Sequence, residues 1–458
     1  MLGHNRHERP EHVVAGGPRD LATAPMQRTS TNEVEEQTLH LLEEMLANIP
    51  DVLGVRLWNG QLWPDERPRA ATLVLQHSNT LAGMLSAGTE GGLADCYLDN
   101  DFDLEGDIEA AFECVDVLLG RLKDWRQKWK AAELLWRLPV KSQRRISGRL
   151  LPKLCGRRHS PERDRRAVTF HYDLSNDFYR LWLDEHMVYS CAYFDSPNDN
   201  LDGAQKRKLD YICRKLRLSA GQRLLDMGCG WGGLVLHAAK HFGVHATGIT
   251  LSERQAEEAP VRLAAAGMEE NAEIRVCDYR DLTGEANCYD AIASVGMAEH
   301  VGREQLPNYF ATTRRLLKLC GIFLNHAIGE GIIPRGENSN GSFIERYVFP
   351  DGDIPPLPMM LRAAESAGFE IRDVENLREH YGLTLRRWLR NLEARYGEAR
   401  AFVSEETYRV WRLYPAGSGH CFRCGQLGVY QTLLAKLDDT GAAGLLLTRE
   451  DWYRQQNR

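Results

Sequence analysis

The stretch from Leu224 to Gly233 reads L-L-D-M-G-C-G-W-G-G, a short apolar run followed by a carboxylate and a glycine-rich turn. The apolar run predicts a central parallel strand that is buried on both faces. Gly228, Gly230 and Gly233 permit a tight turn, close approach of a ligand and close packing of the next helix against the sheet. We expect that helix over residues 232–242. The pattern predicts a nucleotide-type cofactor site at the end of the strand.

The glycine spacing also satisfies G-x-G-x-x-G, the fingerprint of dinucleotide-binding folds. Asp226 distinguishes between a dinucleotide and a cationic ligand. Its charge would repel a pyrophosphate but suits the cationic amino and sulfonium groups of S-adenosylmethionine. The acidic residue expected on a ribose about 20 residues past the glycines is only loosely matched, by Glu253. We therefore predict S-adenosylmethionine as the ligand, with a dinucleotide as the alternative.

The composition is that of an ordinary globular protein. The chain has 458 residues, of which 43% are apolar and 26% charged, enough for two or three domains. No apolar run approaches the roughly 18 residues of a membrane span. The 11 cysteines lack the spacing of a disulfide framework, which is typical of the cytoplasm. The net charge of −7 argues against general nucleic-acid binding.

The domain organisation follows from shifts in pattern. Residues 1–33 are polar, without an apolar signal segment, and predict a flexible tail. Residues 34–130 mix strand-like and helical patterns and predict a small α/β module. Residues 167–458 alternate strands and helices and predict a doubly wound α/β domain with its ligand at the carboxyl ends of the strands. The strands located by pattern are 223–227, 246–250, 273–277, 290–295, 322–327 and 369–374. Pro260 is expected to kink or shorten the helix over 252–266.

Residues 131–166 are expected to form a basic linker. Glu162 and Asp164 are the acidic residues between positions 141 and 166, against ten basic ones. A solvated linker is one interpretation. Attraction to an anionic membrane surface, at about 1 kcal/mol per basic residue, is the other, and interleaved leucines favour it. The basic residues are Lys141, Arg144, Arg145, Arg149, Lys153, Arg157, Arg158, Arg163, Arg165 and Arg166.

Further motifs carry a resemblance to a known family. They are H-Y-D-L-S-N-D-F-Y at 171–179, Y-S-C-A-Y-F at 189–194, G-I-T-L-S at 248–252, S-V-G-M-A-E-H-V-G at 294–302 and N-H-A-I-G at 325–329. With the glycine turn, they make residues 55–453 resemble the cyclopropane-fatty-acyl-phospholipid synthase family, which includes mycolic acid cyclopropane synthases and fatty acid methyltransferases. The resemblance implies a seven-stranded, Rossmann-like class I methyltransferase sheet beside the smaller N-terminal module.

The resemblance implies a set of residues that bind S-adenosylmethionine, to which we add Asp226 for its charge. Asp278 is expected to end the third strand and accept a hydrogen bond from the adenine amino group. Tyr279 is expected to stack on the ring. The remaining cofactor residues implied are Tyr189, Ser190, Gly228, Cys229, Gly230, Thr250, Leu251 and Gln255.

The resemblance also implies the chemistry. A methylene group would pass from the cofactor to the cis double bond of an unsaturated phospholipid acyl chain, through a carbocation that aromatic faces suit. Tyr172, Phe178, Tyr193 and Phe194 are candidates for those faces. The base that removes the final proton would be a bicarbonate ion, held by Cys191, Glu299, His326, Ile328 and Tyr381. A fatty acid methyltransferase that leaves a 10-methylene chain is the alternative, and a catalytically dead lipid-binding protein is a rival of another class.

Taken singly, these residues have simpler explanations. Cys191 would be a small buried apolar residue, His326 a core histidine and Glu299 a helix cap. Cys421 and Cys424 form a C-x-x-C with no second pair, so we predict no metal site. Among departures from the family pattern, Ser418 occupies a position where relatives often carry cysteine, and Ala298 replaces a bulky aromatic residue.

The expected partners follow from the substrate. Acyl chains lie in a bilayer, so we expect a peripheral protein at the inner membrane face that contacts an anionic surface through the N-terminal module and the basic linker. The sequence does not decide between a monomer and a homodimer.

Overall fold

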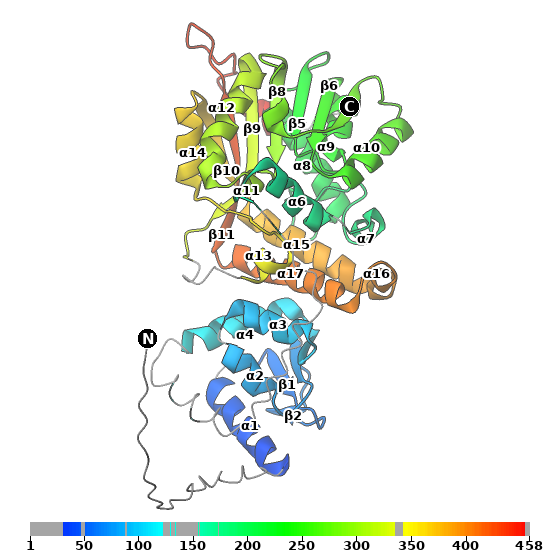
Figure 1. Ribbon diagram of the computed structural model, residues 1–458, viewed down its shortest axis with the longest axis vertical. Coiled ribbons are helices and arrows are strands. Elements are labelled where there is room, and N and C mark those ends of the chain that lie inside the picture. The colour runs from blue at the N-terminus through cyan, green and yellow to red at the C-terminus, as the bar shows by residue number, and fades with distance from the viewer. Residues whose placement is uncertain are drawn as a thin grey trace, which may run out of the picture.

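The computed structural model describes residues 31–46, 51–87, 89–121, 156–172, 174–334 and 342–453, with residues 129, 133 and 154. Figure 1 shows a sheet domain, a layer of helices below it that includes α15 and α17, and the N-terminal module beyond that layer. No helix within these described ranges has the length and apolar character needed to cross a membrane.

The N-terminal module is a small α/β unit, as the pattern predicts. Its sheet has the order β2-β1-β3-β4. The strands are β1 (Leu53–Arg56), β2 (Leu62–Trp63), β3 (Ala71–Leu75) and β4 (Phe102–Gly106), and the helices are α1 (Thr31–Leu46), α2 (Thr80–Ala87), α3 (Glu90–Leu98) and α4 (Ile108–Arg121). The expected tail is wrong for residues 31–33, which already belong to α1. The reason is an apolar stripe along α1, whose Val34, Leu41 and Met45 are buried.

The second domain contains a seven-stranded sheet with the order β10-β11-β9-β8-β5-β6-β7, which confirms the expected fold class. Strand β11 runs antiparallel to both of its neighbours, β10 and β9, and the other pairs of the sheet are parallel. The strands are β5 (Arg223–Met227), β6 (His245–Thr250), β7 (Ala272–Val276), β8 (Tyr289–Val295), β9 (Leu317–Glu330), β10 (Glu370–Asn376) and β11 (Leu427–Ala435). The sequence pattern did not locate β11, and β9 is longer than expected because residues before 322 and after 327 also pair with neighbours.

Alternate residues of the sheet enter two separate cores, as a doubly wound arrangement requires. Leu224 packs with residues of α8 and α9, whereas Leu225 packs with residues of α12 and α14 on the other face. The helices of this domain are α6 (Pro161–Tyr172), α7 (Asn176–Arg180), α8 (Leu201–Lys215), α9 (Gly233–Phe242), α10 (Glu253–Ala265), α11 (Ala298–Val301), α12 (Leu306–Leu316), α13 (Phe343–Tyr347), α14 (Leu357–Ser366), α15 (Arg378–Ala394), α16 (Tyr396–Phe402), α17 (Glu405–Arg423) and α18 (Glu450–Tyr453). Of the two expected effects of Pro260, shortening is wrong, because α10 spans both sides of it.

The helical layer holds the N-terminal module through polar contacts. Glu109 on α4 is buried and accepts a 2.7 Å hydrogen bond from Arg386 Nε on α15, and it also pairs with Arg423 on α17. Arg409 on α17 donates to the Tyr97 carbonyl at 2.9 Å. These bonds satisfy buried charges that would otherwise destabilise the interface.

Candidate active site

A cavity lies at the carboxyl ends of β5 and β6, where the doubly wound fold predicts a ligand. All eleven residues expected to bind the cofactor line it, although they come from four separate parts of the chain. They are Tyr189, Ser190, Asp226, Gly228, Cys229, Gly230, Thr250, Leu251, Gln255, Asp278 and Tyr279.

The glycine turn forms the floor of this cavity. Gly228 and Gly230 have φ values of +84° and +55°, which other residues adopt only with strain. The Gly228 and Cys229 N–H groups both donate to the Ile249 carbonyl at 2.9 Å, which ties the turn to β6. A Cβ at Gly233 would lie 2.9 Å from the His186 carbonyl oxygen. The third glycine therefore lets α9 approach the loop before Tyr189, while Leu234 and Val235 of α9 pack against Leu224 of the sheet as expected.

Asp226 is a buried carboxylate at the end of β5. Its side chain accepts no hydrogen bond from the described residues, and Oδ1 is fully enclosed. Burial raises the pKa of Asp226 to about 7, against the opposing charge of Lys208. A cationic group of a ligand would supply the missing partner, so the cavity fits the ammonium end of S-adenosylmethionine.

Two polar residues of α8 support the Tyr189-Ser190 segment, and sequence reasoning missed both. Gln205 Nε2 donates to the Val188 and Ser190 carbonyls at 3.2 and 2.8 Å, and Lys208 Nζ donates to Ser190 Oγ at 2.9 Å. Both lie on the apolar stripe of α8 with Leu201, Leu209 and Ile212. Polar residues on an otherwise apolar helix face were the signal available in the sequence.

Asp278 lies at the rim of the cavity, but it does not end the third strand as expected. β7 ends at Val276, and Asp278 is instead the N-cap of a short 3-10 helix, η1 (Tyr279–Asp281), where it accepts from the Arg280 N–H at 2.9 Å. The Arg280 guanidinium also contacts both carboxylate oxygens, at 2.8 and 2.6 Å. A carboxylate offers about four acceptor positions, so Asp278 retains capacity for a ligand.

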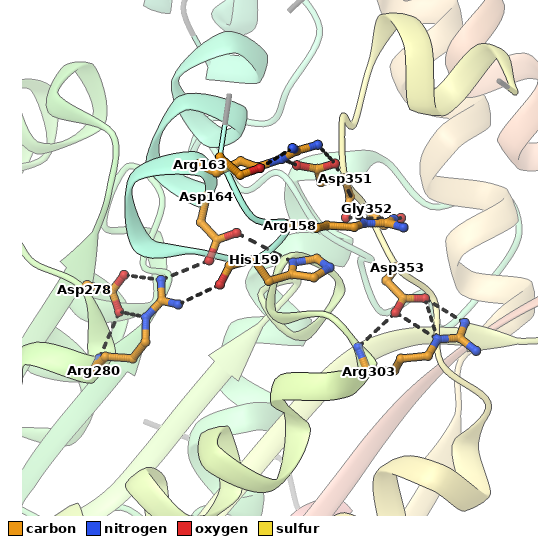
Figure 2. Close-up of polar contacts among 11 residues, drawn as sticks. Arg158, His159, Arg163, Asp164, Asp278, Arg280, Arg303, Asp351, Gly352 and Asp353 are labelled. Carbon is orange, nitrogen blue, oxygen red and sulfur yellow. Dashed lines mark hydrogen bonds and ion pairs between the residues drawn. The ribbon is translucent and has the colours of Figure 1, made fainter. Parts of the chain in front are cut away.

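Arg280 connects this rim to α6, which covers the cavity (Figure 2). Its Nη2 lies 3.0 Å from Asp164 Oδ2, and its Nη1 donates to the His159 carbonyl at 3.3 Å. Asp164, Val168 and Tyr172 of α6 line the cavity. The pairing explains why α6 lies over the cofactor site.

The end of the expected basic linker is therefore part of the catalytic domain. Residues 161–166 belong to α6, and Arg163 Nη2 bonds Asp351 Oδ1 at 2.8 Å (Figure 2). Arg158 donates to the Gly352 carbonyl at 3.5 Å. The linker assignment is wrong here, because both arginines pair with the Asp351 carboxylate of the same domain. Arg144 and Arg145 lie outside the described residues.

Glu299 and Ile328 come together in a second polar cluster. The Ile328 N–H on β9 donates to Glu299 Oε1 at 2.7 Å, while the buried Oε2 has no partner in the described structure. Burial raises the pKa of Glu299 to about 7. Glu299 lies inside α11 and does not cap it, because Met297 holds the N-cap position.

His326 lies two residues before Ile328 and therefore on the same face of β9. Its Nδ1 lies 3.2 Å from Gln431 Nε2, and its buried Nε2 has no partner among the residues described. Burial lowers the pKa of His326 to about 3, so the ring is neutral at physiological pH. With the Gln431 amide donating to Nδ1, the ring carries its proton on Nε2.

Cys191 and Tyr381 meet at the start of α15. Cys191 Sγ donates to the Leu377 carbonyl at 3.8 Å, and the Tyr381 N–H donates to the same carbonyl at 3.1 Å. Burial holds the pKa of Tyr381 well above its usual value, and Tyr414, Cys191 and Glu299 lie close enough to raise it further. Burial likewise raises the pKa of the Cys191 thiol, which is not a thiolate. None of the five expected base-site residues lines the cofactor cavity.

The aromatic candidates separate into two groups. Tyr172 and Phe178 belong to a ring cluster with Tyr179, Trp182, Tyr189, Trp231 and Trp411. Tyr193 stacks instead on His380 with centroids 4.7 Å apart, and the Phe194 N–H donates to the same histidine. Tyr193 therefore lies apart from the ring cluster, against Tyr211 of α8 and His380 of α15. Sequence reasoning missed Trp411 and Tyr414, which come from the distant α17.

Comparison with known proteins identifies the family of the chain. The family model described as mycolic acid cyclopropane synthetase matches residues 159–432. A probable fatty acid methyltransferase of Pseudomonas putida is 38% identical over 420 residues, covering 90% of this chain and 100% of the relative. The cyclopropane-fatty-acyl-phospholipid synthase of Escherichia coli K12 is 36% identical over 271 residues, covering 59% of this chain and 68% of the relative.

Solved structures agree with this placement. The cyclopropane synthase MmaA2 from Mycobacterium tuberculosis is 31% identical with a TM-score of 0.56, covering 59% of this chain and 97% of its own. The mycolic acid cyclopropane synthase CmaA1, solved in complex with SAH and CTAB, is 35% identical with a TM-score of 0.55, covering the same shares. The chain therefore belongs to the mycolic acid cyclopropane synthetase family of S-adenosylmethionine-dependent enzymes, with its class I methyltransferase fold.

Proposed function

We propose that this enzyme transfers a methylene group from S-adenosylmethionine to the cis double bond of an unsaturated phospholipid acyl chain and forms a cyclopropane. The observation that carries the proposal is the presence of two separate buried polar sites. One is the cofactor cavity, and the other is the cluster around Glu299 and His326 outside the lining of that cavity. A two-step reaction requires a donor site and a base site, and relatives named as cyclopropane synthases support this reading.

The first step is methyl transfer. An alkene carbon attacks the sulfonium methyl, the C–S bond breaks, and the neighbouring carbon becomes a carbocation. Asp226 would hold the cofactor ammonium, and Asp278 and Tyr279 would bind the adenine. Tyr172 lines the cavity and belongs to the aromatic cluster, so its ring face suits the cation and the surrounding rings exclude water.

The second step is loss of a proton from the added methyl group, whose C–H electron pair closes the ring. The buried atoms without partners at Glu299 Oε2 and His326 Nε2 fit a small oxygen-rich ion such as bicarbonate. A bound bicarbonate would supply the basic oxygen. His326 would donate through Nε2, Ile328 fixes the Glu299 carboxyl group, and Cys191 and Tyr381 would complete the pocket.

A second candidate product is a methyl-branched chain, in which a hydride shifts from the methylated carbon to the neighbouring cationic carbon, and the cation now on the methylated carbon loses a methyl proton to leave a 10-methylene group. The relative that this chain covers over its full length is named a probable fatty acid methyltransferase, which favours this candidate. Both products use the same donor and the same first carbocation, so the choice between them depends on whether the base removes a methyl proton before or after the hydride shift.

Incubation with oleoyl phospholipid vesicles and methyl-labelled S-adenosylmethionine separates the two products. We expect fatty esters that are one CH₂ group heavier, with cyclopropane protons upfield of all others in the proton NMR spectrum. Exocyclic vinyl protons would instead establish the 10-methylene product. Unlabelled lipid together with tight donor binding would favour a catalytically dead lipid-binding protein.

We also propose that the enzyme binds an anionic membrane surface through the N-terminal module and the basic segment. Since Arg158 and Arg163 are engaged within the domain, the remaining basic residues would carry the attraction. Replacing Arg144 and Arg145 with glutamine should reduce sedimentation with anionic vesicles at low salt. Undiminished binding would assign these residues to a solvated linker.

A further inference from the structure

The cofactor cavity contains a buried lysine, Lys208, that is not among the eleven residues expected to bind the cofactor. Lys208 on α8 is 1% exposed and lines the cavity. Its Nζ donates to Ser190 Oγ at 2.9 Å and forms no ion pair within the described structure. An ammonium group has three donors, and a buried charge without a counter-charge is strongly unfavourable. The geometry therefore leaves Lys208 in need of an anionic partner.

A second lysine on the same helix shows how the chain neutralises a buried ammonium elsewhere. Lys215 is also fully buried, and its Nζ lies 2.6 Å from Glu375 Oε2 and 3.4 Å from Asp373 Oδ2. Lys208 Nζ contacts the Ser190 hydroxyl, whereas Lys215 Nζ contacts two carboxylates. The difference indicates that the counter-charge of Lys208 arrives with the ligand.

Asp226 is the complementary case in the same cavity. It is a buried carboxylate that accepts no hydrogen bond from the described residues, and it does not pair with Lys208. The cavity thus presents one anion and one cation that attract each other but form no ion pair within the described structure. The amino-acid end of S-adenosylmethionine is a zwitterion that carries both complementary charges.

We propose that Lys208, together with the Ser190 hydroxyl, binds the α-carboxylate of S-adenosylmethionine, while Asp226 binds its α-ammonium group. Gln205 supports this arrangement, because its hydrogen bonds to the Val188 and Ser190 carbonyls hold Ser190 within hydrogen-bonding distance of Lys208. Burial lowers the pKa of Lys208 to about 8, and a bound carboxylate would restore the charged form. The assignment concerns the donor and holds for either acyl product.

Calorimetry with two ligands tests the proposal without turnover. One ligand is S-adenosylhomocysteine, and the other is its decarboxylated analogue, which lacks only the α-carboxylate. We expect the parent protein to prefer S-adenosylhomocysteine by at least about tenfold, the range for a hydrogen bond to a charged group. Lys208→Met, which keeps the chain length and removes the charge, should lose this preference by weakening S-adenosylhomocysteine alone.

The controls separate carboxylate binding from support of the loop. Lys206→Met removes an exposed lysine from the same helix and should change neither affinity. Equal weakening of both ligands in Lys208→Met would make Lys208 a support for Ser190 and overturn the proposal. If circular dichroism shows that Lys208→Met does not fold, the parent protein alone tests the proposal. Equal affinity of the parent protein for both ligands would overturn it. A variant that keeps the preference but requires more bicarbonate for turnover would assign Lys208 to the base site and also overturn it.

Discussion

At the scale of single residues, the two buried carboxylates of Asp226 and Glu299 lie in different sites. Burial raises the pKa values of Asp226 and Glu299 to about 7, yet one lies in the cofactor cavity and the other contacts β9. A cationic ligand stabilises the charged form of Asp226. Glu299 has no cation beside it in the described structure, so its environment favours a carboxyl group that changes protonation near neutral pH.

Donor affinity should depend on pH through Asp226. Below a pH of about 7 the free carboxyl group is protonated and neutral, so a cationic ligand must first displace the proton. We expect the affinity for S-adenosylhomocysteine to fall as the pH drops below about 7, by up to about tenfold per pH unit. Calorimetry across this range measures the slope. Asp226→Asn should bind more weakly and without this slope, and a slope unchanged in that variant would assign the titration to another group.

Glu299→Gln should lose most of the turnover and keep donor binding, because Glu299 is placed at the base site. A loss of about 100-fold in kcat is expected for removal of a group that assists proton transfer. The KM for S-adenosylmethionine should not rise in parallel. Glu304→Gln, at an exposed position nearby, is the matched control. Failure of a folded Glu299→Gln protein to bind S-adenosylhomocysteine would show that the two sites are not separate.

At the scale of elements, α6 is the cover of the cofactor cavity. Asp164 in its first turn is joined to the rim by Arg280 (Figure 2). Arg163 of α6 and Arg158 just before the helix are joined to the 351–353 loop. That loop contacts the other site, since the Asp353 N–H donates to the Glu299 carbonyl at 2.9 Å. The ion pairs of α6 therefore connect the surroundings of both sites.

Asp164→Asn should loosen α6, because it leaves Arg280 with a weaker partner on that helix. Trypsin cleaves after arginine, and Arg165 and Arg166 are exposed on α6. We expect faster cleavage at these residues in the variant, and an affinity for S-adenosylhomocysteine that is several-fold lower. Glu162→Gln, at an exposed position on the first turn of the same helix, should behave as the parent. Equal cleavage rates in all three proteins would contradict the role given to this ion pair.

At the scale of the whole molecule, the N-terminal module contacts the helices that carry part of the base site. Glu109 pairs with Arg386 on α15 and Arg423 on α17, while Tyr381 and Phe422 on the same helices have ring centroids 4.7 Å apart. The module is therefore joined to elements that reach the base site, as well as being a candidate for membrane contact (Figure 1).

Glu109→Gln should destabilise the protein, because it removes the carboxylate that neutralises two arginines. Loss of hydrogen bonds to charged groups costs about 2 kcal/mol. Urea unfolding followed by tryptophan fluorescence measures the change in the free energy of unfolding. Glu113→Gln, exposed on the same helix, should change it by less than about 0.5 kcal/mol. Equal stability of the two variants would place the main attachment of the module elsewhere.

The sequence by itself determined the class of fold and the cofactor turn, because these depend on local properties. Gly228 and Gly230 were identified by their spacing and do adopt positive φ, and the apolar run at 224–225 does form a strand buried on both faces. Motif resemblance also named ten of the residues that line the cavity, and the charge argument added Asp226. Each of these signals is contained within a few consecutive residues.

Only the tertiary structure decided which distant groups meet. Lys208 lies 18 positions from Ser190, and Arg280 lies 116 positions from Asp164, so neither contact has a local pattern. Strand β11 escaped location because a short apolar run does not separate a buried strand from a helix. The last ten residues of the linker expected at 131–166 belong to α6 and the segment just before it, because carboxylates far along the chain pair with their arginines. Long-range pairing of buried charges depends on how the elements pack, and the sequence order of those charges does not contain it.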